Sequence, residues 1–267
     1  MSFRAVSTRR CGKTDHDRCR ELPVSLLADL HNHSCLSPCG SLELSPRTLA
    51  ELAAARGVRV LALTDHNTGL NCPAFAKVCP RYGIIPLFGM EATTREEIHV
   101  LCIFTGLDAA LSFGEYAYGL ITPLPNDPEK TGDQVYVDEE DNIEGELEYF
   151  LPGALDIGVD DIGGKAAEYG GLVIPAHVDR SAFSMTSQLG VVVDGPWAAV
   201  ECVRLPPAAD TLGYPLITSS DAHYPEHVAR RPFELDITAE ELAPAGPRGE
   251  ADMAALKRAL ERRPRFR

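Results

Sequence analysis

The sequence lacks any apolar run that approaches the ~20 residues a helix needs to cross a bilayer, which excludes a membrane-spanning protein. Residues 1–22 also lack the apolar stretch of ~7–15 residues that a secretory signal contains. None of the eight cysteines forms a CxxC pair. We therefore expect a cytoplasmic protein with free thiols in a reducing compartment.

Basic residues are in the minority. Lys and Arg number 25 against 39 for Asp and Glu, so the formal net charge is −14. A chain this acidic repels long polyanions, so no stable complex with duplex nucleic acid is expected. The 267 residues are 45% hydrophobic and 24% charged, an ordinary globular composition that excludes disordered and collagen-like classes. This length suits one large domain, because barrels reach ~250 residues as a single unit.

From Ser25 onward, short apolar runs that end in polar residues alternate with helical stretches. The predicted strands lie in residues 25–33, 58–66, 83–94, 97–104, 198–204 and 214–223, and helices are predicted over 46–56, 71–82 and 250–262. Residues 166–180 are predicted to contain the end of a further helix, a glycine stop and a strand that ends at His177. Such alternation is typical of parallel strands. Because polar residues recur at the carboxyl ends of many strands, we predict an α/β barrel of roughly seven strands with one shared mouth. An open doubly wound sheet is the alternative.

Two segments fall outside this alternation. Residues 1–25 are basic and polar without a period, and we predict a flexible N-terminal extension ahead of a barrel domain at 26–267. Residues from about 107 to 157 are rich in Pro, Asp, Glu and Gly and are predicted to be an insertion, with a hairpin around QVYVDEEDNIEG. Loops this long are usually lids, binding elements or disordered. The acidic run 138–141 is interpreted as a solvated turn, since it lacks the 12-residue calcium-loop pattern.

Six of the eight histidines lie beside predicted strand ends, together with three carboxylates. These residues are His31, His33, His66, His99, His177 and His223, with Asp65, Glu91 and Asp221. Six imidazoles that converge on one face of a barrel would each need a partner, which argues against purely structural roles. Imidazole with carboxylate is the ligand set of zinc, iron and manganese. Residues i and i+2 of a strand share a face, so His31 and His33 can point at one ion, as can Asp221 and His223. The sequence therefore predicts a site for several divalent ions.

The ordered motifs DLHNHS, TDH, GME, HVL, PAH and SDAH resemble those of the PHP family, which is named for polymerase and histidinol phosphatase domains. The resemblance covers roughly Ala28 to His223. It implies a distorted (β/α)7 TIM-like barrel, here with an inserted segment. It also implies two or three divalent metal ions (Zn, Mn or Fe) that hydrolyse phosphate esters.

The resemblance also implies which residues hold each ion. His31 and His33 would hold the first ion with Glu91 and Asp221; Glu91 would bridge to a second ion, completed by His99 and His177; and His66 and His223 would hold a third. Family members usually add a His or Asp to this third site shortly after the HxH motif.

Cys39 occupies roughly that place in this chain, which is a departure from the family pattern. A thiolate ligand would favour zinc over manganese. The alternatives are that Cys39 is only buried in a turn or that the third site is empty. Asp65 could bind an ion directly or orient a neighbouring ligand, and we favour the second role.

The expected chemistry is attack by a metal-bridging hydroxide while the ions clamp the phosphoryl oxygens. Glu91 would set the ion spacing, and His223 or Asp221 could protonate the leaving group if not committed to metal. Because the arginine fork matches phosphate oxygens, Arg180 and Arg204 are the candidate substrate-binding residues. The alternative for Arg180 is a salt bridge to Asp179 or to the acidic insertion.

The leading hypothesis is a stand-alone metal-dependent phosphoesterase that acts on a small phosphorylated metabolite, a nucleotide or a short oligonucleotide. A histidinol-phosphatase-type monoesterase is one alternative. A non-catalytic metal-binding or regulatory module is another, which the complete ligand set argues against. Hydrolysis of a carbon–nitrogen bond is a third possibility, but the strand ends lack a lysine that could be carbamylated to bridge two ions.

Overall fold

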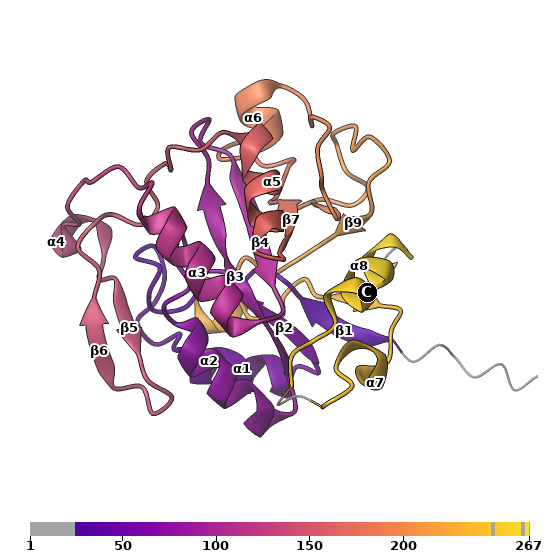
Figure 1. The fold of residues 1–267 in the computed structure, drawn as a ribbon, viewed down its shortest axis with the longest axis horizontal. Coiled ribbons are helices and arrows are strands. Elements are labelled where there is room, and N and C mark those ends of the chain that lie inside the picture. The colour runs from indigo at the N-terminus through magenta and orange to yellow at the C-terminus, as the bar shows by residue number, and fades with distance from the viewer. Residues whose placement is uncertain (1–24, 247–248, 263–264, 267) are drawn as a thin grey trace, which may run out of the picture.

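A curled, mixed sheet forms the centre of the protein, a computed structural model of which describes residues 25–246, 249–262 and 265–266 (Figure 1). The predicted N-terminal extension lies, apart from Ser25, outside the described residues. The sheet has seven strands in the order β11-β10-β1-β2-β3-β4-β7. They are β1 (Leu26–Asp29), β2 (Val60–Leu63), β3 (Ile85–Thr93), β4 (His99–Phe104), β7 (Leu172–Pro175), β10 (Phe233–Leu235) and β11 (Arg265–Phe266).

Helices cover the sheet on the side that Figure 1 turns to the viewer, where α1 and α2 lie below α3. The α-helices are α1 (Pro46–Ala55), α2 (Cys72–Val78), α3 (Leu107–Tyr118), α4 (Pro128–Thr131), α5 (Val159–Glu168), α6 (Met185–Leu189), α7 (Ala239–Leu242) and α8 (Met253–Glu261), with 3-10 turns η1 (Cys79–Tyr82) and η2 (Pro225–His227). The first helix begins at the predicted residue and ends at Ala55, one residue before the predicted end, with Arg56 as its C-cap. Ser45 accepts a hydrogen bond from the Thr48 amide, Pro46 stands in the first turn, and Gly57 follows with a φ of 86°. None of the helices within the described ranges has the length and apolar character of a membrane span.

The strands are not all parallel, which corrects the predicted pairing. Strands β1, β2 and β3 are parallel as expected, but β4 runs antiparallel to both β3 and β7. Only residues 94–98 separate β3 from β4. That link is too short for the crossover of a dozen or more residues that a parallel pair needs. The reversal places the start of β4 beside the carboxyl end of β3.

The sheet curls toward closure through two further strands. Strands β8 (Val200–Glu201) and β9 (Leu216–Ile217) pair with each other in parallel. A single bridge joins Val173 of β7 to Trp197, and another joins Asn32 to Ala222. The observed fold is therefore α/β with a curled mixed sheet. Single bridges stand where a complete (β/α)7 barrel would have continuous pairing, so the predicted full barrel is not confirmed.

Alternate residues of the central strands enter two hydrophobic cores. Leu61, Met90 and Cys102 belong to the core beneath the covering helices. Val60, Leu87 and Leu101 belong to an inner core that α8 closes with Leu256 and Leu260. Because successive side chains of a strand point to opposite faces, Glu91 and His99 share the inner face with Leu87 and Leu101. The two site residues therefore stand at the upper rim of the inner core.

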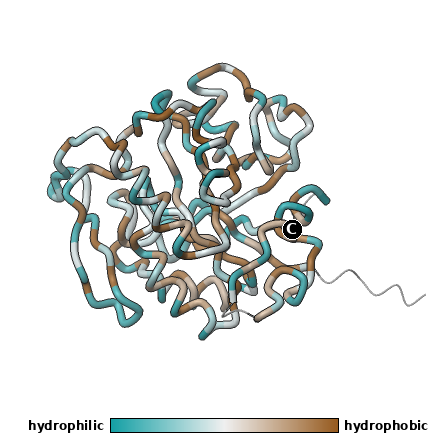
Figure 2. The backbone as a smooth tube through the Cα atoms, viewed as in Figure 1, coloured by the Kyte–Doolittle hydropathy of each residue, from teal (hydrophilic) through white to brown (hydrophobic). Residues whose placement is uncertain are grey.

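The segment 107–157 is only partly irregular. Its first twelve residues form α3, which packs against β3 and β4 as a covering helix. The predicted hairpin is present as β5 (Val135–Val137) and β6 (Ile143–Glu146), which pair antiparallel. Figure 2 shows hydrophilic residues gathered at its turn. The acidic run there meets basic side chains rather than water alone, since Glu139 contacts Lys77 and Glu140 contacts Arg47.

Candidate metal centre

The six predicted histidines converge at one end of the curled sheet. His31 and His33 follow β1, His66 follows β2, His99 begins the reversed strand β4, His177 follows β7, and His223 follows β9. Neighbouring ring centroids lie as close as 4.0 Å, for His33 and His223, and 4.6 Å, for His33 and His66. Residues nearly two hundred positions apart therefore meet in one pocket, as the sequence predicts.

Glu91 lies at the centre of this cluster and is only 1% exposed. Its Oε1 lies 2.7 Å from His99 Nδ1, 3.0 Å from His177 Nε2 and 3.2 Å from His31 Nε2, and its Oε2 lies 3.2 Å from His66 Nδ1 and 3.3 Å from His33 Nε2. Five imidazoles thus surround one carboxylate. Asp221 Oδ1 also lies close to two of these rings, 3.5 Å from His31 Nε2 and 3.4 Å from His33 Nε2.

Hydrogen bonds on the outer side of the cluster fix the tautomers of the HxH pair. His31 Nδ1 lies 2.9 Å from Glu201 Oε2, so this nitrogen is the donor to the carboxylate. Ser37 uses its only hydroxyl hydrogen to donate to Asp65 Oδ1 at 2.7 Å. His33 Nδ1, 2.9 Å from Ser37 Oγ, must therefore donate as well. In the neutral form both rings then present an unprotonated Nε2 toward Glu91 and Asp221.

This donor set fits divalent cations. The two Nε2 atoms lie 3.2 Å apart, and in the neutral rings their lone pairs face each other and two carboxylates, an arrangement that a cation between them satisfies. Two further ring nitrogens, His66 Nδ1 and His177 Nδ1, are buried without a hydrogen-bond partner among the described residues. His66 Nδ1 is close to Glu91 Oε2 but makes no hydrogen bond with it. Buried orphan nitrogens are rare and call for an ion or another partner.

The electrostatics of the cluster keep its carboxylates ionised. Burial alone would raise the pKa of Glu91, but His99 and His31 hold it well below its usual value. Burial likewise opposes ionisation of Asp221, and His31 and His33 lower its pKa below the usual range. Burial and the neighbouring His33 lower the pKa of His223 to about 3. At neutral pH both Asp221 and His223 are deprotonated, which suits metal ligands better than the predicted proton donor.

Three groups of side chains have ligand atoms close enough to share an ion, and they regroup the predicted sets. The groups are His31, His33 and Asp221; His66, Glu91 and His99; and His33, His66 and His223. The first group contains three of the four residues predicted for the first site and lacks the fourth, Glu91. In the second, His66 stands beside Glu91 and His99, where His177 was expected. In the third, His33 joins the predicted pair His66 and His223.

Asp65 does not face the cluster as a ligand. Its Oδ1 accepts hydrogen bonds from the Ser34 amide and Ser37 Oγ, and its Oδ2 accepts one from Ser34 Oγ. Both oxygens are therefore occupied, and Asp65 acts on the cluster through Ser37, which holds His33. This arrangement supports the orienting role favoured from the sequence, and Asp65 belongs to none of the three ligand groups among the described residues, so its role at a metal stays a prediction.

Cys39 stands at the edge of the cluster. Its Sγ lies 3.3 Å from His66 Nε2, and the residue lines the pocket above the histidines. The thiol is thus beside the predicted third site, although it belongs to none of the three ligand groups among the described residues. Ligation by Cys39 remains a prediction.

The two predicted arginines have different positions. Arg180 lines the pocket, and its Nη1 donates to Asp221 Oδ2 at 3.0 Å, so neither Asp179 nor the acidic insertion is its partner. Arg204 is exposed and is absent from the lining of this pocket. The Asp179 carboxylate instead accepts hydrogen bonds from the Val203 and Arg204 amides, which fixes the backbone after β8.

Glu201 is a site residue that the sequence reasoning missed. It ends β8, is 1% exposed, and its Oε2 accepts hydrogen bonds from His31 Nδ1 and from the His177 amide. An acidic residue inside the apolar run AAVECVR was the available signal. Glu201 thereby helps to fix His31 and His177, which both contact Glu91 Oε1.

Replacing Glu201 by Ala is expected to lower metal affinity about 10- to 100-fold, because His31 loses the acceptor that fixes its tautomer. Competition with a fluorescent chelator measures this affinity. The Glu201→Gln variant keeps an acceptor oxygen, so its metal affinity should fall less than that of Glu201→Ala. Equal affinity in the wild type and Glu201→Ala would contradict the orienting role.

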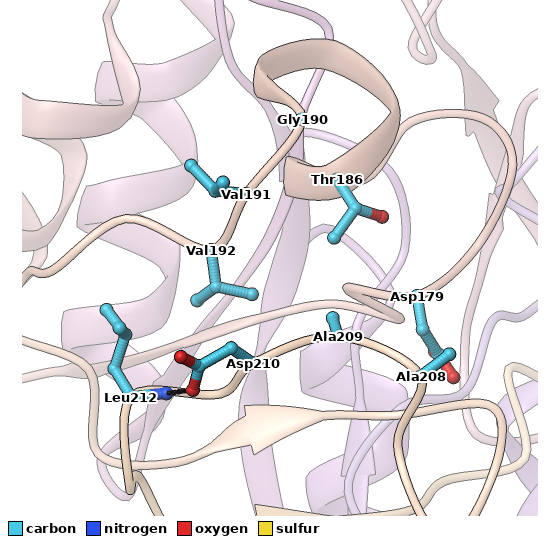
Figure 3. Close-up of a pocket in the computed structure, with 9 residues that line it drawn as sticks. All are labelled: Asp179, Thr186, Gly190, Val191, Val192, Ala208, Ala209, Asp210 and Leu212. Carbon is cyan, nitrogen blue, oxygen red and sulfur yellow. Dashed lines mark hydrogen bonds between the residues drawn. The ribbon is translucent and has the colours of Figure 1, made fainter.

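A pocket of ≈370 Å³ opens above the cluster. Its lining includes His66, Glu91, His99, Asp221 and His223, and residues of the 107–157 segment supply part of its wall. A second hollow of ≈450 Å³ lies nearby, below α6 (Figure 3). Its two carboxylates are engaged by backbone amides, Asp210 by Leu212 and Asp179 by Val203. The part of the chain that the structure describes places no histidine, cysteine or basic side chain in that lining, so the first pocket is the candidate active site.

Solved structures share this fold at low identity. The chain is similar to the lesion-specific endonuclease Q of Pyrococcus furiosus (TM-score 0.58, 17% identity, 91% of this chain), of which it spans 58%. A structure of endonuclease Q with a 27-mer duplex carrying an abasic lesion gives a TM-score of 0.57 at 17% identity, covering 89% of this chain and 57% of that one. A candidate metal-dependent phosphoesterase from Bifidobacterium adolescentis is similar with a TM-score of 0.55 and 15% identity. The match covers 91% of this chain and 98% of that one.

That endonuclease Q was solved with a duplex substrate is at odds with the expectation of no stable complex with duplex nucleic acid, which stays a prediction for this chain. No curated protein matches the chain. The PHP domain family matches residues 29–141, which include the HxH motif, His66, Glu91 and His99. These residues are therefore identified as a PHP domain, the family that the motifs of the sequence resemble.

Proposed function

We propose that this protein is a hydrolase that uses two or three divalent metal ions (Zn, Mn or Fe) to cleave small phosphate esters. The observation that carries the proposal is the buried Glu91 carboxylate with five imidazoles within 3.3 Å, at the floor of an open pocket. A single structural salt bridge would not need five imidazoles around one carboxylate, and His31 and His33 in their neutral forms present an unprotonated Nε2 to it. The complete set of donors beside an open pocket also favours catalysis over a purely structural metal.

The residues of the site have two proposed roles: some would bind metal, and others orient the metal ligands. One ion would be held by His31, His33 and Asp221. A second, beside Glu91, would be held by His99 together with His66 or His177. A third would be held by His223, His66 and Cys39. When bound, such ions activate water and stabilise charge on phosphoryl oxygens. Glu91 contacts histidines of each of these groups and would set the separation of the ions that they hold. Ser37 and Glu201 accept hydrogen bonds from the Nδ1–H groups of His33 and His31, which keeps the Nε2 atom of each neutral ring free to bind metal.

Arg180 supplies the cation that would hold a substrate phosphate. It is the only Arg or Lys among the described residues that line the pocket. One of its guanidinium nitrogens pairs with Asp221, and the other two have no acceptor within the described ranges. The fork can therefore donate to a phosphate oxygen while it keeps Asp221 in place.

Replacing Arg180 by Ala is expected to raise KM for phosphate substrates about tenfold, the effect of a lost charge-assisted hydrogen bond at a half-exposed position. Steady-state kinetics on an aryl phosphate measures it. Arg204→Ala is the matched control, because that arginine lies outside the pocket lining. Similar KM values for the wild type and Arg180→Ala would remove Arg180 from the phosphate site.

A panel of phosphate mono- and diesters with added Mn²⁺ or Zn²⁺ tests the proposed function. We expect turnover of at least one small ester, loss of turnover with a chelator, and recovery when metal is restored. Tight metal binding with no turnover across the panel would favour the non-catalytic metal-binding module instead.

A short duplex with an abasic lesion belongs in the same panel, because endonuclease Q acts on such a substrate. The net charge of −14 favours a small substrate over duplex DNA, and so does the presence of only one Arg or Lys, Arg180, among the described residues that line the pocket. Faster cleavage of the duplex than of every small ester would contradict this part of the proposal.

A further inference from the structure

The wall of the pocket above the metal centre is apolar and aromatic rather than polar. Apart from the ligand-type residues and Arg180, the lining consists of Pro38, Thr131, Phe150, Pro152 and Phe183. On the basis of the proposed function, we propose that the substrate carries a flat aromatic ring next to its phosphate, and that Phe183 and Phe150 bind this ring.

Phe183 is held at the rim of the metal centre. Its ring stacks on His99 with a centroid distance of 4.9 Å and an interplanar angle of 18°, although the residue is 41% exposed. Its carbonyl accepts a hydrogen bond from the His99 amide, and its φ of 54° is unusual for a residue with a large side chain. An exposed ring kept in a strained conformation beside reacting groups is typical of a ligand contact.

Phe150 lies on a firmly anchored wall. The next residue, Leu151, is fully buried, and its amide donates to Gln134 Oε1 at 2.8 Å. The amide group of Asn67, just after His66, donates to the carbonyls of Leu151 and Gly153 at 2.6 and 2.7 Å. The 107–157 segment is thus tied directly to the end of β2. It contributes a fixed side of the pocket rather than a free loop.

The same wall offers little to a sugar or polyol. The only hydroxyl among the described side chains of this wall belongs to Thr131, and its single hydrogen is already shared between two acceptors, Asn126 Oδ1 at 2.7 Å and the Asp127 carbonyl at 2.8 Å. A polyol would lose its hydrogen bonds to water against Phe150, Pro152 and Phe183 without replacement. An aromatic ring gains from the same surface, because it buries apolar area and stacks.

Binding of two phosphonates that cannot be hydrolysed tests the aromatic subsite without turnover. Titration calorimetry on the zinc-loaded protein should show phenylphosphonate binding about fivefold or more tighter than methylphosphonate, the scale of one stacking contact. Phe183→Ala and Phe150→Ala should each reduce this preference, and Phe183→Leu should restore only part of it. Leu124→Ala is the control, since this residue is 59% exposed, lies in the same segment and does not line the pocket.

Equal binding of the two phosphonates by the wild type would overturn the aromatic subsite, as would an unchanged preference in both phenylalanine variants. Failure to hydrolyse any ester would instead contradict the proposed function, because the binding experiment needs no reaction. Two matched pairs of esters then identify the source of the ring. A higher kcat/KM for adenosine 5′-phosphate than for ribose 5-phosphate indicates a nucleobase, and a higher value for phosphotyrosine than for phosphoserine indicates a phenol. Preference for neither aromatic member would count against the subsite.

Discussion

Replacing Glu91 by Gln is expected to abolish phosphoesterase turnover, with a loss of about a thousandfold or more, and to lower the number of bound metal ions. The amide keeps the shape of the side chain but removes the charge that five imidazoles surround. A neutral oxygen is a weak ligand for a divalent cation, and metal ions contribute several kcal/mol to stabilising the transition state. Both kcat and the metal content per chain, by elemental analysis, should therefore fall together.

Glu43→Gln is the control for the Glu91 variant, because Glu43 is an exposed carboxylate outside the pocket lining. This control should keep wild-type turnover and metal content. If Glu91→Gln retained most of its turnover, the bridging role of Glu91 would be wrong. If it lost turnover but kept every ion, the carboxylate would act in the reaction without holding metal.

Replacing Gly89 by Ala is expected to destabilise the protein by about 3 kcal/mol or more, although Gly89 touches no candidate ligand. A Cβ at this position would lie 2.0 Å from the Cys102 carbonyl oxygen of the paired strand β4, which is backbone and cannot swing away. Strands β3 and β4 would have to separate. Because Glu91 lies on β3 and His99 begins β4, metal affinity should fall with stability.

Urea unfolding measures the free energy of the Gly89 variant, and Gly164→Ala is the matched control. Gly164 lies inside α5, and a Cβ there would have no neighbour within 4 Å. Alanine should leave stability unchanged or raise it by up to about 1 kcal/mol, since it favours helix more than glycine does. A Gly89→Ala protein with the wild-type midpoint would show that the β3–β4 pairing tolerates separation.

The ligand-type histidines could be predicted from the sequence because each stands at a strand end. The alternation of apolar runs and helices places the ends of parallel strands at one edge, and the HxH spacing puts His31 and His33 on one face. The reversed strand β4 breaks the rule of parallel pairing, yet His99 still reaches the site because its strand begins there. Only five residues separate β3 from β4, which is too few for a crossover helix. The short link therefore already indicates an antiparallel pair, which the prediction of parallel strands did not take into account.

Other features of the site depend on contacts between distant segments, which a single sequence does not record. Glu201 meets His31 across 170 positions, and the role of Ser37 depends on Asp65. Asp221 has a φ of 46°, so it reaches the cluster from left-handed backbone rather than from the regular strand that its position predicts. Arg204 ends the predicted strand 198–204, but its own amide and that of Val203 donate hydrogen bonds to Asp179, and the backbone so fixed leaves Arg204 outside the pocket lining.

Anomalous X-ray diffraction from crystals of the metal-loaded protein tests the central claim most directly, since it locates each ion at its own absorption edge. The account predicts two or three peaks beside the Glu91 carboxylate, each within bonding distance of histidines from the cluster. Ions found only at other positions, or a cluster that stays empty at saturating Zn²⁺ and Mn²⁺, would contradict it.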